Sequence, residues 1–203
     1  MGIGVLIIGQ SGTGKSTSIR TLSQAGVINV IGKPLPFRDR IKTIITDDTK
    51  RITDIMIKCA TASIVIDDAG YLLTNYYVWN HNNSGNKYQV FDELATSFFM
   101  LIDTIRLLHK RKIVYVMMHE DETVSGKIKP KTIGKMLDDK ICIEGMFSIV
   151  LRSGARDGKY FFTTQSDGND VAKSPMDMFK ETRIENDLGL VDKTIREYYG
   201  LTQ

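Results

Sequence analysis

The chain has 203 residues, 42% of them hydrophobic and 25% charged, with a formal net charge of +3 at pH 7. This length suits one α/β core and is too short for two ordinary domains, and the composition is typical of a soluble globular protein. No stretch approaches the ~18–20 apolar residues of a membrane-spanning helix, and the first residues lack the basic leader of a signal peptide. We therefore expect one domain over 1–203, located in the cytoplasm and without a membrane partner.

In the first sixty residues, short apolar runs alternate with segments of helical spacing. Residues 3–8 form an unbroken apolar run, which predicts a buried strand of a parallel sheet. A helix is expected over 14–24, further strands over 27–31 and 42–46, and a second helix over 49–60.

The rest of the chain continues this alternation. Residues 63–66 and 113–118 each predict a central strand, and apolar residues recur at helical spacing over 89–109, which predicts one long amphipathic helix. Runs at 147–153 and 159–164 flank an Asp-Gly pair, a strong signal for a β-hairpin. The pattern favours one doubly wound α/β domain with a mostly parallel sheet and a C-terminal antiparallel hairpin.

The segment after the first predicted strand has the spacing G-x-x-x-x-G-K-S. Gly12 and Gly14 allow the backbone to aim its N–H groups at phosphate oxygens, and the first turn of the expected helix adds its own free N–H groups. Lys15 would reach the β- and γ-phosphates and act in catalysis, and the Ser16 hydroxyl would bind Mg²⁺. This predicts ATP and Mg²⁺ as ligands; the alternatives are a chance glycine-rich turn and a degenerate site that does not hydrolyse. The expected binding residues are Gly9, Ser11, Gly12, Thr13, Gly14, Lys15, Ser16 and Thr17.

Acidic side chains end two of the predicted strands. Asp67 follows a central strand, where its carboxylate can hold Mg²⁺ together with Ser16. Asp68 is a candidate general base, and the alternative is a helix cap or loop carboxylate. His119 and Glu120 end the next apolar strand, where they could sense the γ-phosphate or position water. Glu120 is the second candidate for the base, and the alternative for this pair is an exposed strand end.

The chain lacks the sequence motifs that are typical of other P-loop classes. No N/T-K-x-D guanine reader and no L-S-G-G-Q segment is present, which argues against a GTPase and a transporter-type ATPase. A small-molecule kinase would need an arginine-rich lid, for which Arg38 and Arg40 are a thin basis.

Five segments together carry a resemblance that spans nearly the whole chain: Gly9–Ser16, 64–68, 114–120, 131–135 and 168–175. They resemble phage-encoded RecA-like P-loop ATPases, an AAA-domain group associated with phage recombination and replication genes. The resemblance implies a RecA-type core, ATP as substrate, assembly into a ring or filament, and single-stranded DNA as a ligand. It also implies phage recombination or replication proteins as partners, in the host cytoplasm. Bacterial RecA-type recombinases carry a catalytic Glu at the end of the strand before the Mg²⁺-binding one; here the comparable strands end in Gly32 or in Asp47-Asp48, which leaves the base open.

Two segments are candidates for binding single-stranded DNA. No acid lies between Glu122 and Asp138, while four lysines do, and these could neutralise ~3–4 phosphates; the alternative is an ordinary solvated loop. Residues 71–79 directly follow the two aspartates, and their rings could stack on bases. The alternative is that these rings pack a helix onto the core. The residues expected to contact DNA are Lys127, Lys129, Lys131, Lys135, Tyr77 and Trp79.

The C-terminal part offers candidates for contacts between subunits. Arg152 and Arg156 flank the predicted hairpin, and RecA-like assemblies complete each site with a basic finger from the neighbour. The alternative is an exposed hairpin charge. Residues 165–203 have little periodicity before 191–199, and we expect them to wrap the core or clasp a neighbouring subunit.

Cys59 and Cys142 stand alone, without metal-ligand spacing. Two buried thiols in a reducing cytosol are expected, and the alternative is a disulfide between them.

These observations favour a Mg²⁺-dependent ATPase of RecA-like fold, stimulated by single-stranded DNA and acting in phage DNA recombination or replication. Two rivals remain: an ATP-switched adaptor or loader that does not hydrolyse, and a small-molecule phosphotransferase.

Overall fold

The structure is a computed structural model that describes residues 1–38, 41–82, 86–133 and 141–201. Its strands are β1 Ile3–Gly9, β2 Gly26–Asn29, β3 Thr43–Ile45, β4 Ser63–Asp67, β5 Ile113–Glu122, β6 Ile128–Pro130, β7 Ile149–Arg156, β8 Lys159–Thr163 and β9 Arg183–Glu185. Its helices are α1 Thr49–Lys58, α2 Gly70–Asn80, α3 Lys87–Leu107 and α5 Leu188–Tyr198, with 3-10 helices η1 Ser16–Thr21 and η2 Ile143–Met146.

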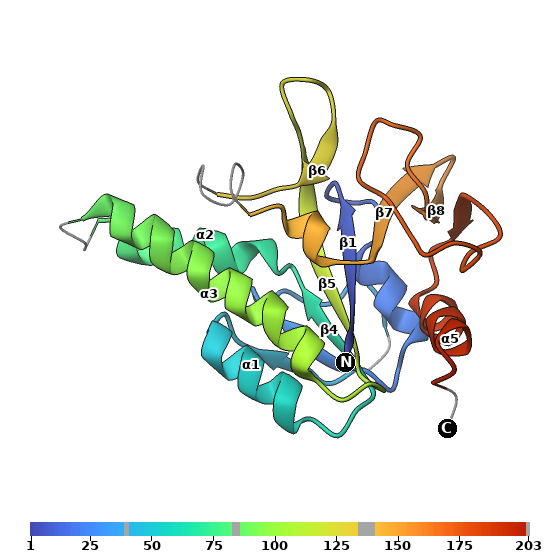
Figure 1. The fold of residues 1–203 in the computed structure, drawn as a ribbon, viewed down its shortest axis with the longest axis horizontal. Coiled ribbons are helices and arrows are strands. Elements are labelled where there is room, and N and C mark those ends of the chain that lie inside the picture. The colour runs from blue at the N-terminus through green and yellow to red at the C-terminus, as the bar shows by residue number, and fades with distance from the viewer. Residues whose placement is uncertain (39–40, 83–85, 134–140, 202–203) are drawn as a thin grey trace.

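The strands form one mixed sheet at the centre of the molecule (Figure 1). Their order is β3-β2-β4-β5-β1-β7-β8-β9, with β6 paired to β5 outside this path. The pairs from β3 to β7 are parallel, whereas β7, β8 and β9 pair antiparallel. The chain is therefore an α/β protein with a mostly parallel sheet, and β7 turns into β8 at the Asp-Gly pair.

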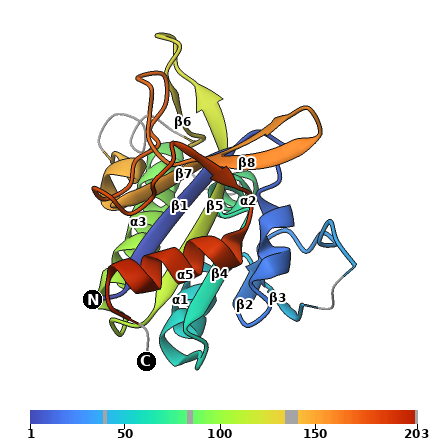
Figure 2. The ribbon, with the colours of Figure 1, turned by 90° about the vertical axis from the view of Figure 1, so that its right-hand side faces the viewer.

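Both faces of the sheet are covered, which explains why the central strands are apolar without alternation. Along β5, Val114, Val116 and Met118 enter one core cluster with α1, α2 and α3. Ile113, Tyr115 and Met117 enter the other cluster, with η1 and α5. Figure 2 shows α5 crossing the face of the sheet opposite to α1 and α3.

The strand order brings together the ends of three strands that carry predicted site residues. β5 lies between β1 and β4, and its register places Gly9 level with His119. Asp67 ends β4 at the same edge. β1 stops at Gly9, and beyond that level Glu120 of β5 and Arg152 of β7 form an ion pair.

The helix expected over 14–24 was wrong in type and length, because the structure has only the short 3-10 helix η1. The Ser18 hydroxyl donates to the Lys15 carbonyl at 2.6 Å, and the Thr21 hydroxyl donates to the Ser18 carbonyl at 3.0 Å. Hydroxyls that bond backbone carbonyls three residues back compete with regular helix hydrogen bonds. The chain then turns into β2 at Gly26, which leaves no room for further turns.

The C-terminal helix α5 packs on its own sheet. Its Leu188, Val191 and Ile195 side chains are buried. Asp192 accepts hydrogen bonds from Ser63 at 2.6 Å and from Tyr115 at 2.9 Å, which ties the helix to β4 and β5. Among the helices that the structure describes, none is long and apolar enough to cross a membrane.

The two cysteines are free thiols, but the expectation that both are buried was wrong. Cys59 follows the last turn of α1 and is half-buried, and Cys142 lies exposed before η2.

Candidate nucleotide-binding site

The glycine-rich loop after β1 is curled by two glycines in the left-handed region. Gly12 has φ 82° and Gly14 has φ 90°. A Cβ on Gly14 would also lie 2.8 Å from the ring of Tyr160, so this position admits no side chain. The Thr13 hydroxyl donates to the Gln10 carbonyl at 2.8 Å and shares a 2.7 Å hydrogen bond with Ser153 on β7. The loop is thus braced from within and against the neighbouring strand.

Lys15 lies inside this loop. Its ammonium donates to the carbonyls of Gly9 at 2.7 Å and Gln10 at 2.9 Å, and the residue is only 5% exposed. Burial lowers the pKa of Lys15 to about 8, while the charges of Asp68 and Asp67 oppose that shift. Among the described residues, the hydrogen-bond partners of this buried ammonium are neutral carbonyls, and anionic phosphate oxygens would be stronger partners.

Ser16 and Asp67 are the two side chains whose oxygens could bind a Mg²⁺ ion. The Ser16 hydroxyl donates to Asp67 Oδ1 at 2.9 Å. The other oxygen, Oδ2, is buried and has no hydrogen-bond partner among the described residues. Burial, and then the Asp68 charge, raise the pKa of Asp67 to about 6, partly offset by the Ser16 hydrogen bond. A hard cation that prefers oxygen ligands would satisfy this carboxylate.

Within the described ranges, no group of three or more His, Cys, Asp or Glu side chains could hold a metal ion by itself. Mg²⁺ commonly binds through one or two protein oxygens together with substrate phosphates.

Asp68 adopts a backbone conformation that is unusual for its type. Its φ is 59°, and the residue is 2% exposed. Its carboxylate forms an ion pair with Lys33 through Oδ2 and lies 3.6 Å from His119 Nε2 through Oδ1. Helix α2 is preceded by Ala69 at its cap position, with no side-chain cap bond, so Asp68 is not the helix cap. Strained buried polar residues of this kind concentrate at functional sites.

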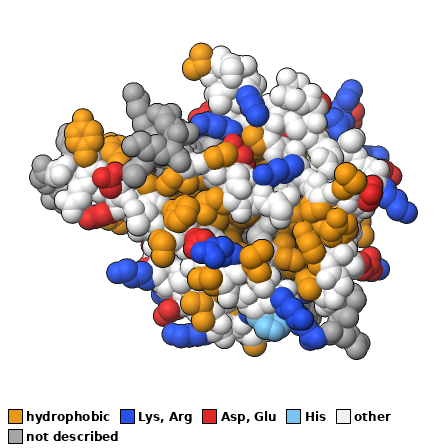
Figure 3. Space-filling view, in the orientation of Figure 1, with side chains coloured by type: hydrophobic (Ala, Val, Ile, Leu, Met, Phe, Trp, Pro, Cys, Tyr) orange, Lys and Arg blue, Asp and Glu red, His pale blue; other side chains and the backbone are white. Residues whose placement is uncertain are grey.

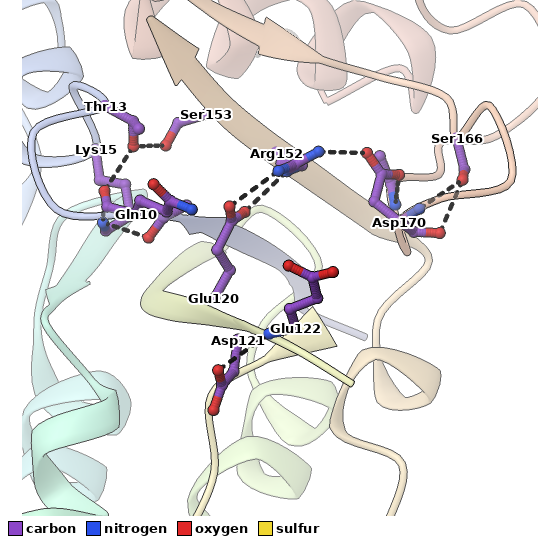
Figure 4. Close-up of polar contacts among 12 residues, drawn as sticks. Gln10, Thr13, Lys15, Glu120, Asp121, Glu122, Arg152, Ser153, Ser166 and Asp170 are labelled. Carbon is purple, nitrogen blue, oxygen red and sulfur yellow. Dashed lines mark hydrogen bonds and ion pairs between the residues drawn. The ribbon is translucent and has the colours of Figure 1, made fainter. Parts of the chain in front are cut away.

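His119 and Glu120 lie in different surroundings although they are neighbours in sequence. Burial, followed by the Lys15 charge, lowers the pKa of His119, so its imidazole is neutral near pH 7. Glu120 instead accepts two hydrogen bonds from Arg152, at 2.8 and 3.0 Å, and Arg152 also reaches Asp170 at 3.4 Å (Figure 4). The Glu120 carboxylate is therefore already occupied by a guanidinium.

Two cavities open on either side of His119. The first, of about 290 Å³, is lined by the glycine-rich loop together with Lys33, Pro34, Asp68 and Tyr160. The second, of about 530 Å³, is lined by His119 and Glu120 with Tyr71 and Lys131. The sequence reasoning missed Lys33 and Tyr160. Lys33 stands beside a turn signal, Gly-Lys-Pro, but only the sheet order brings it to Asp68, and Tyr160 comes from a strand far along the chain.

Of the four lysines expected to contact DNA, the structure describes Lys127, Lys129 and Lys131, and these three do not share one loop. Lys127 and Lys129 belong to a hairpin of β5 and β6, in which Asp121 is paired with Lys129. Lys131 lies beyond it, against the second cavity. Lys135 lies outside the described residues, as does Arg40. The expected loop is therefore a protruding strand pair, because β5 continues four residues beyond the predicted strand end.

Tyr77 and Trp79 belong to the last turns of α2, and that end of the helix lies away from the hairpin, at the far end of the α2–α3 pair (Figure 1). Tyr77 stacks on His81, with ring centroids 4.5 Å apart, and packs against Phe91 at 5.2 Å. Tyr77 therefore packs α2 against α3. Trp79 is 70% exposed at the end of α2.

The two arginines expected as fingers also separate. Arg152 is held inside its own chain by Glu120 and Asp170. Arg156 lies at the turn between β7 and β8, with its side chain 75% exposed and 3.7 Å from Asp157.

A glycine-rich loop between a strand and a short helix, an inward lysine, and a hydroxyl–aspartate pair define a P-loop nucleotide-binding protein. A family model described as an AAA domain matches residues 1–176, and the chain belongs to this family. No curated protein matches the chain.

Proposed function

We propose that the chain is a Mg²⁺-dependent ATP hydrolase. The observation that carries this proposal is the Ser16–Asp67 hydrogen bond of 2.9 Å, with a second, unpartnered Asp67 oxygen, next to the buried Lys15. Ser16 and Asp67 would hold the metal ion, which supplies positive charge to the phosphate oxygens. Lys15 and the inward N–H groups of the loop bind the β- and γ-phosphates and stabilise the charge that develops on them.

Asp68 is the residue that we assign as general base. It is buried beside the phosphate cavity, and its carboxylate can accept a proton from a water molecule held near His119. The water oxygen bonds to the γ-phosphorus as the bond from that phosphorus to the bridging oxygen breaks, which yields ADP and phosphate. Glu120 is a poorer base, because both of its carboxylate oxygens already accept hydrogen bonds from the Arg152 guanidinium, at 2.8 and 3.0 Å.

The experiment is phosphate release from ATP by the full chain, with and without Mg²⁺, for wild type and Lys15→Ala. Wild type is expected to turn over only with Mg²⁺, and Lys15→Ala to fall to background while its circular dichroism spectrum is retained. Wild-type turnover by Lys15→Ala would contradict the assignment.

The finer role that we propose is stimulation by single-stranded DNA within phage recombination or replication, in a ring or filament of RecA-like subunits. Support comes from Lys127 and Lys129 on the protruding hairpin. Figure 3 shows Lys and Arg side chains on this part of the molecule, with acidic side chains beside them. The Thr13–Ser153 hydrogen bond and the Arg152–Glu120 ion pair run from the glycine-rich loop to this hairpin. Of the two arginines, only Arg156 is exposed enough to act on a neighbouring subunit.

Fluorescence anisotropy of a labelled oligonucleotide across a salt series tests the DNA role. Lys127→Ala with Lys129→Ala should weaken binding and flatten the slope of log K against log salt by about 1.4, at ~0.7 per phosphate contact. Trp79→Ala should change affinity with little effect on that slope. Absence of binding by wild type at low salt would remove this role.

One observation favours the rival of an ATP-switched adaptor: both candidate bases are ion-paired, Asp68 with Lys33 and Glu120 with Arg152. An adaptor would bind ATP and release no phosphate beyond background in the same assay. A small-molecule phosphotransferase would instead require an acceptor for measurable turnover.

A further inference from the structure

Lys33 is held in place by the strand that precedes it. The buried Asn29 at the end of β2 donates from its amide to the Lys33 carbonyl at 2.6 Å and accepts from the Gly32 N–H at 2.9 Å. Gly32, with φ 69°, makes the turn between them. The backbone of Lys33 is thus fixed by one side chain, while its own side chain extends to Asp68.

The Lys33 side chain spans the phosphate cavity. It forms an ion pair with Asp68, and both residues line the cavity together with Lys15 and Ser16. Its side chain is 43% exposed, against 1% for that of Asp68, so the lysine is the partner that can move. Burial lowers the pKa of Lys33, but Asp68 more than offsets this, and the pKa lies above its usual value, so the side chain is charged.

Two buried carboxylates, Asp67 and Asp68, follow one another, and two lysines, Lys15 and Lys33, face them. A metal ion on Asp67 and phosphates on Lys15 would leave the Lys33–Asp68 pair beside a terminal phosphate group. That group carries more negative charge than one carboxylate, and it offers a better partner to an ammonium on a flexible stem.

We propose that Lys33 is a second phosphate-binding lysine, which leaves Asp68 for the terminal phosphate of a bound nucleoside triphosphate and thereby frees Asp68 to accept the water proton. This proposal rests on the proposed ATPase function. It explains how a carboxylate that is ion-paired before binding can act as a base afterwards. It also makes the site respond to the third phosphate, because a diphosphate leaves Lys33 on Asp68.

The test is calorimetric titration of the full chain with Mg²⁺ and either ADP or ATPγS, a slowly hydrolysed triphosphate. Lys33→Ala should weaken ATPγS binding about tenfold or more, the value of one charged hydrogen bond, and leave ADP affinity close to wild type. Lys33→Arg should restore part of the preference because it keeps the charge. Lys58→Ala is the matched control, since it removes a lysine from an exposed Lys–Asp pair, with Asp54 at 3.2 Å.

A second comparison protects the test against loss of fold, because Lys33→Ala strands a buried carboxylate. Asp68→Asn alone and Asp68→Asn with Lys33→Ala differ only in the lysine, and neither carries that carboxylate. The first should bind ATPγS at least as tightly as wild type, and the second about tenfold more weakly than the first.

The outcomes separate this proposal from the function on which it rests. Wild type that binds neither nucleotide overturns both. Wild type that binds both nucleotides, with the same preference for ATPγS in every variant, overturns the role of Lys33 alone. Equal losses for ADP and ATPγS in both Lys33→Ala backgrounds assign the lysine to structure and likewise overturn its role as a sensor of the third phosphate.

Discussion

The acidic side chains at the ends of the neighbouring strands β4 and β5 have different surroundings. β4 stops at Asp67 and turns at once into α2, so both of its acids are buried at the nucleotide cavity. β5 runs on past Glu120 into a hairpin that leaves the sheet. Its buried carboxylate faces Arg152 on the far side of β1.

The two strand ends differ in the partners that hold their carboxylates, and we base the different roles proposed for them on those partners. Asp67 has a buried oxygen without a hydrogen-bond partner among the described residues, and Asp68 is paired with a partly exposed lysine. Glu120 instead has a two-point contact with a guanidinium that Asp170 also holds. These contacts are the ones that we expect if the β4 side chains change partners when a nucleotide binds, as proposed above. The β5 end is arranged to hold the hairpin in place.

The largest effect is expected when one acid is replaced at each strand end, which tests the contrast between β4 and β5. Asp68→Asn should lower kcat by about 100-fold, because the water proton loses its acceptor. Glu120→Gln should have the smaller effect on kcat and should instead lower the thermal midpoint, because Arg152 loses a charged partner. A steady-state assay with both variants decides, and the reverse order of effects would move the base to the β5 end.

A smaller effect is expected from Asp67, and it depends on pH. The folded-state pKa of about 6 lies above the ordinary value, so the folded protein binds the proton more tightly than the unfolded chain. Its contribution to stability is therefore fully present below about pH 4 and is lost as pH rises through about 6. Asp67→Asn removes the buried charge and should raise the free energy of unfolding at pH 7.5 by about 1–3 kcal/mol without Mg²⁺.

Thermal melting from pH 5 to 8 checks this prediction, with Asp54→Asn on the exposed face of α1 as control. The same Asp67→Asn variant should lose the Mg²⁺ dependence of ATPγS binding, so it gains stability and loses a ligand. A variant that is destabilised at every pH would show that the Ser16 hydrogen bond outweighs burial.

A part of the fold or of the candidate site was predictable when residues close together in the sequence determine it. The glycine-rich loop and Asp67 were predictable, because each is a short motif that must follow an apolar strand. The central strands were predictable for the same reason, whereas β6 and β9 have only three residues and no apolar run. The length of η1 was not, because hydroxyl side chains overrode the helical spacing.

Contacts that depend on strand order could not be read from the sequence. Arg152 reaches Glu120 only because β1, which lies between their strands, ends at Gly9. Arg152 and Arg156 look alike in sequence, four residues apart on one hairpin, yet one is held by two carboxylates and the other is exposed. Lys33 likewise reaches Asp68 because β2, which precedes it, lies beside β4.

The smallest expected effect sharpens the comparison on the β5 side. Arg152→Lys keeps the charge but loses the planar fork that gives Glu120 two hydrogen bonds, and one ammonium cannot reproduce that geometry. We expect a loss of about 1–2 kcal/mol in the free energy of unfolding by urea, the scale of one charged hydrogen bond. Arg156→Lys, on the same hairpin but exposed, is the matched control and should change stability by less than about 0.5 kcal/mol. Because the Glu120 carboxylate is buried, a loosened pair should also admit solvent and speed amide hydrogen exchange along β6. Equal stability of the two variants would mean that the ion pair forms without fixing the hairpin, and the contrast between the β4 and β5 ends would then rest on the nucleotide site alone.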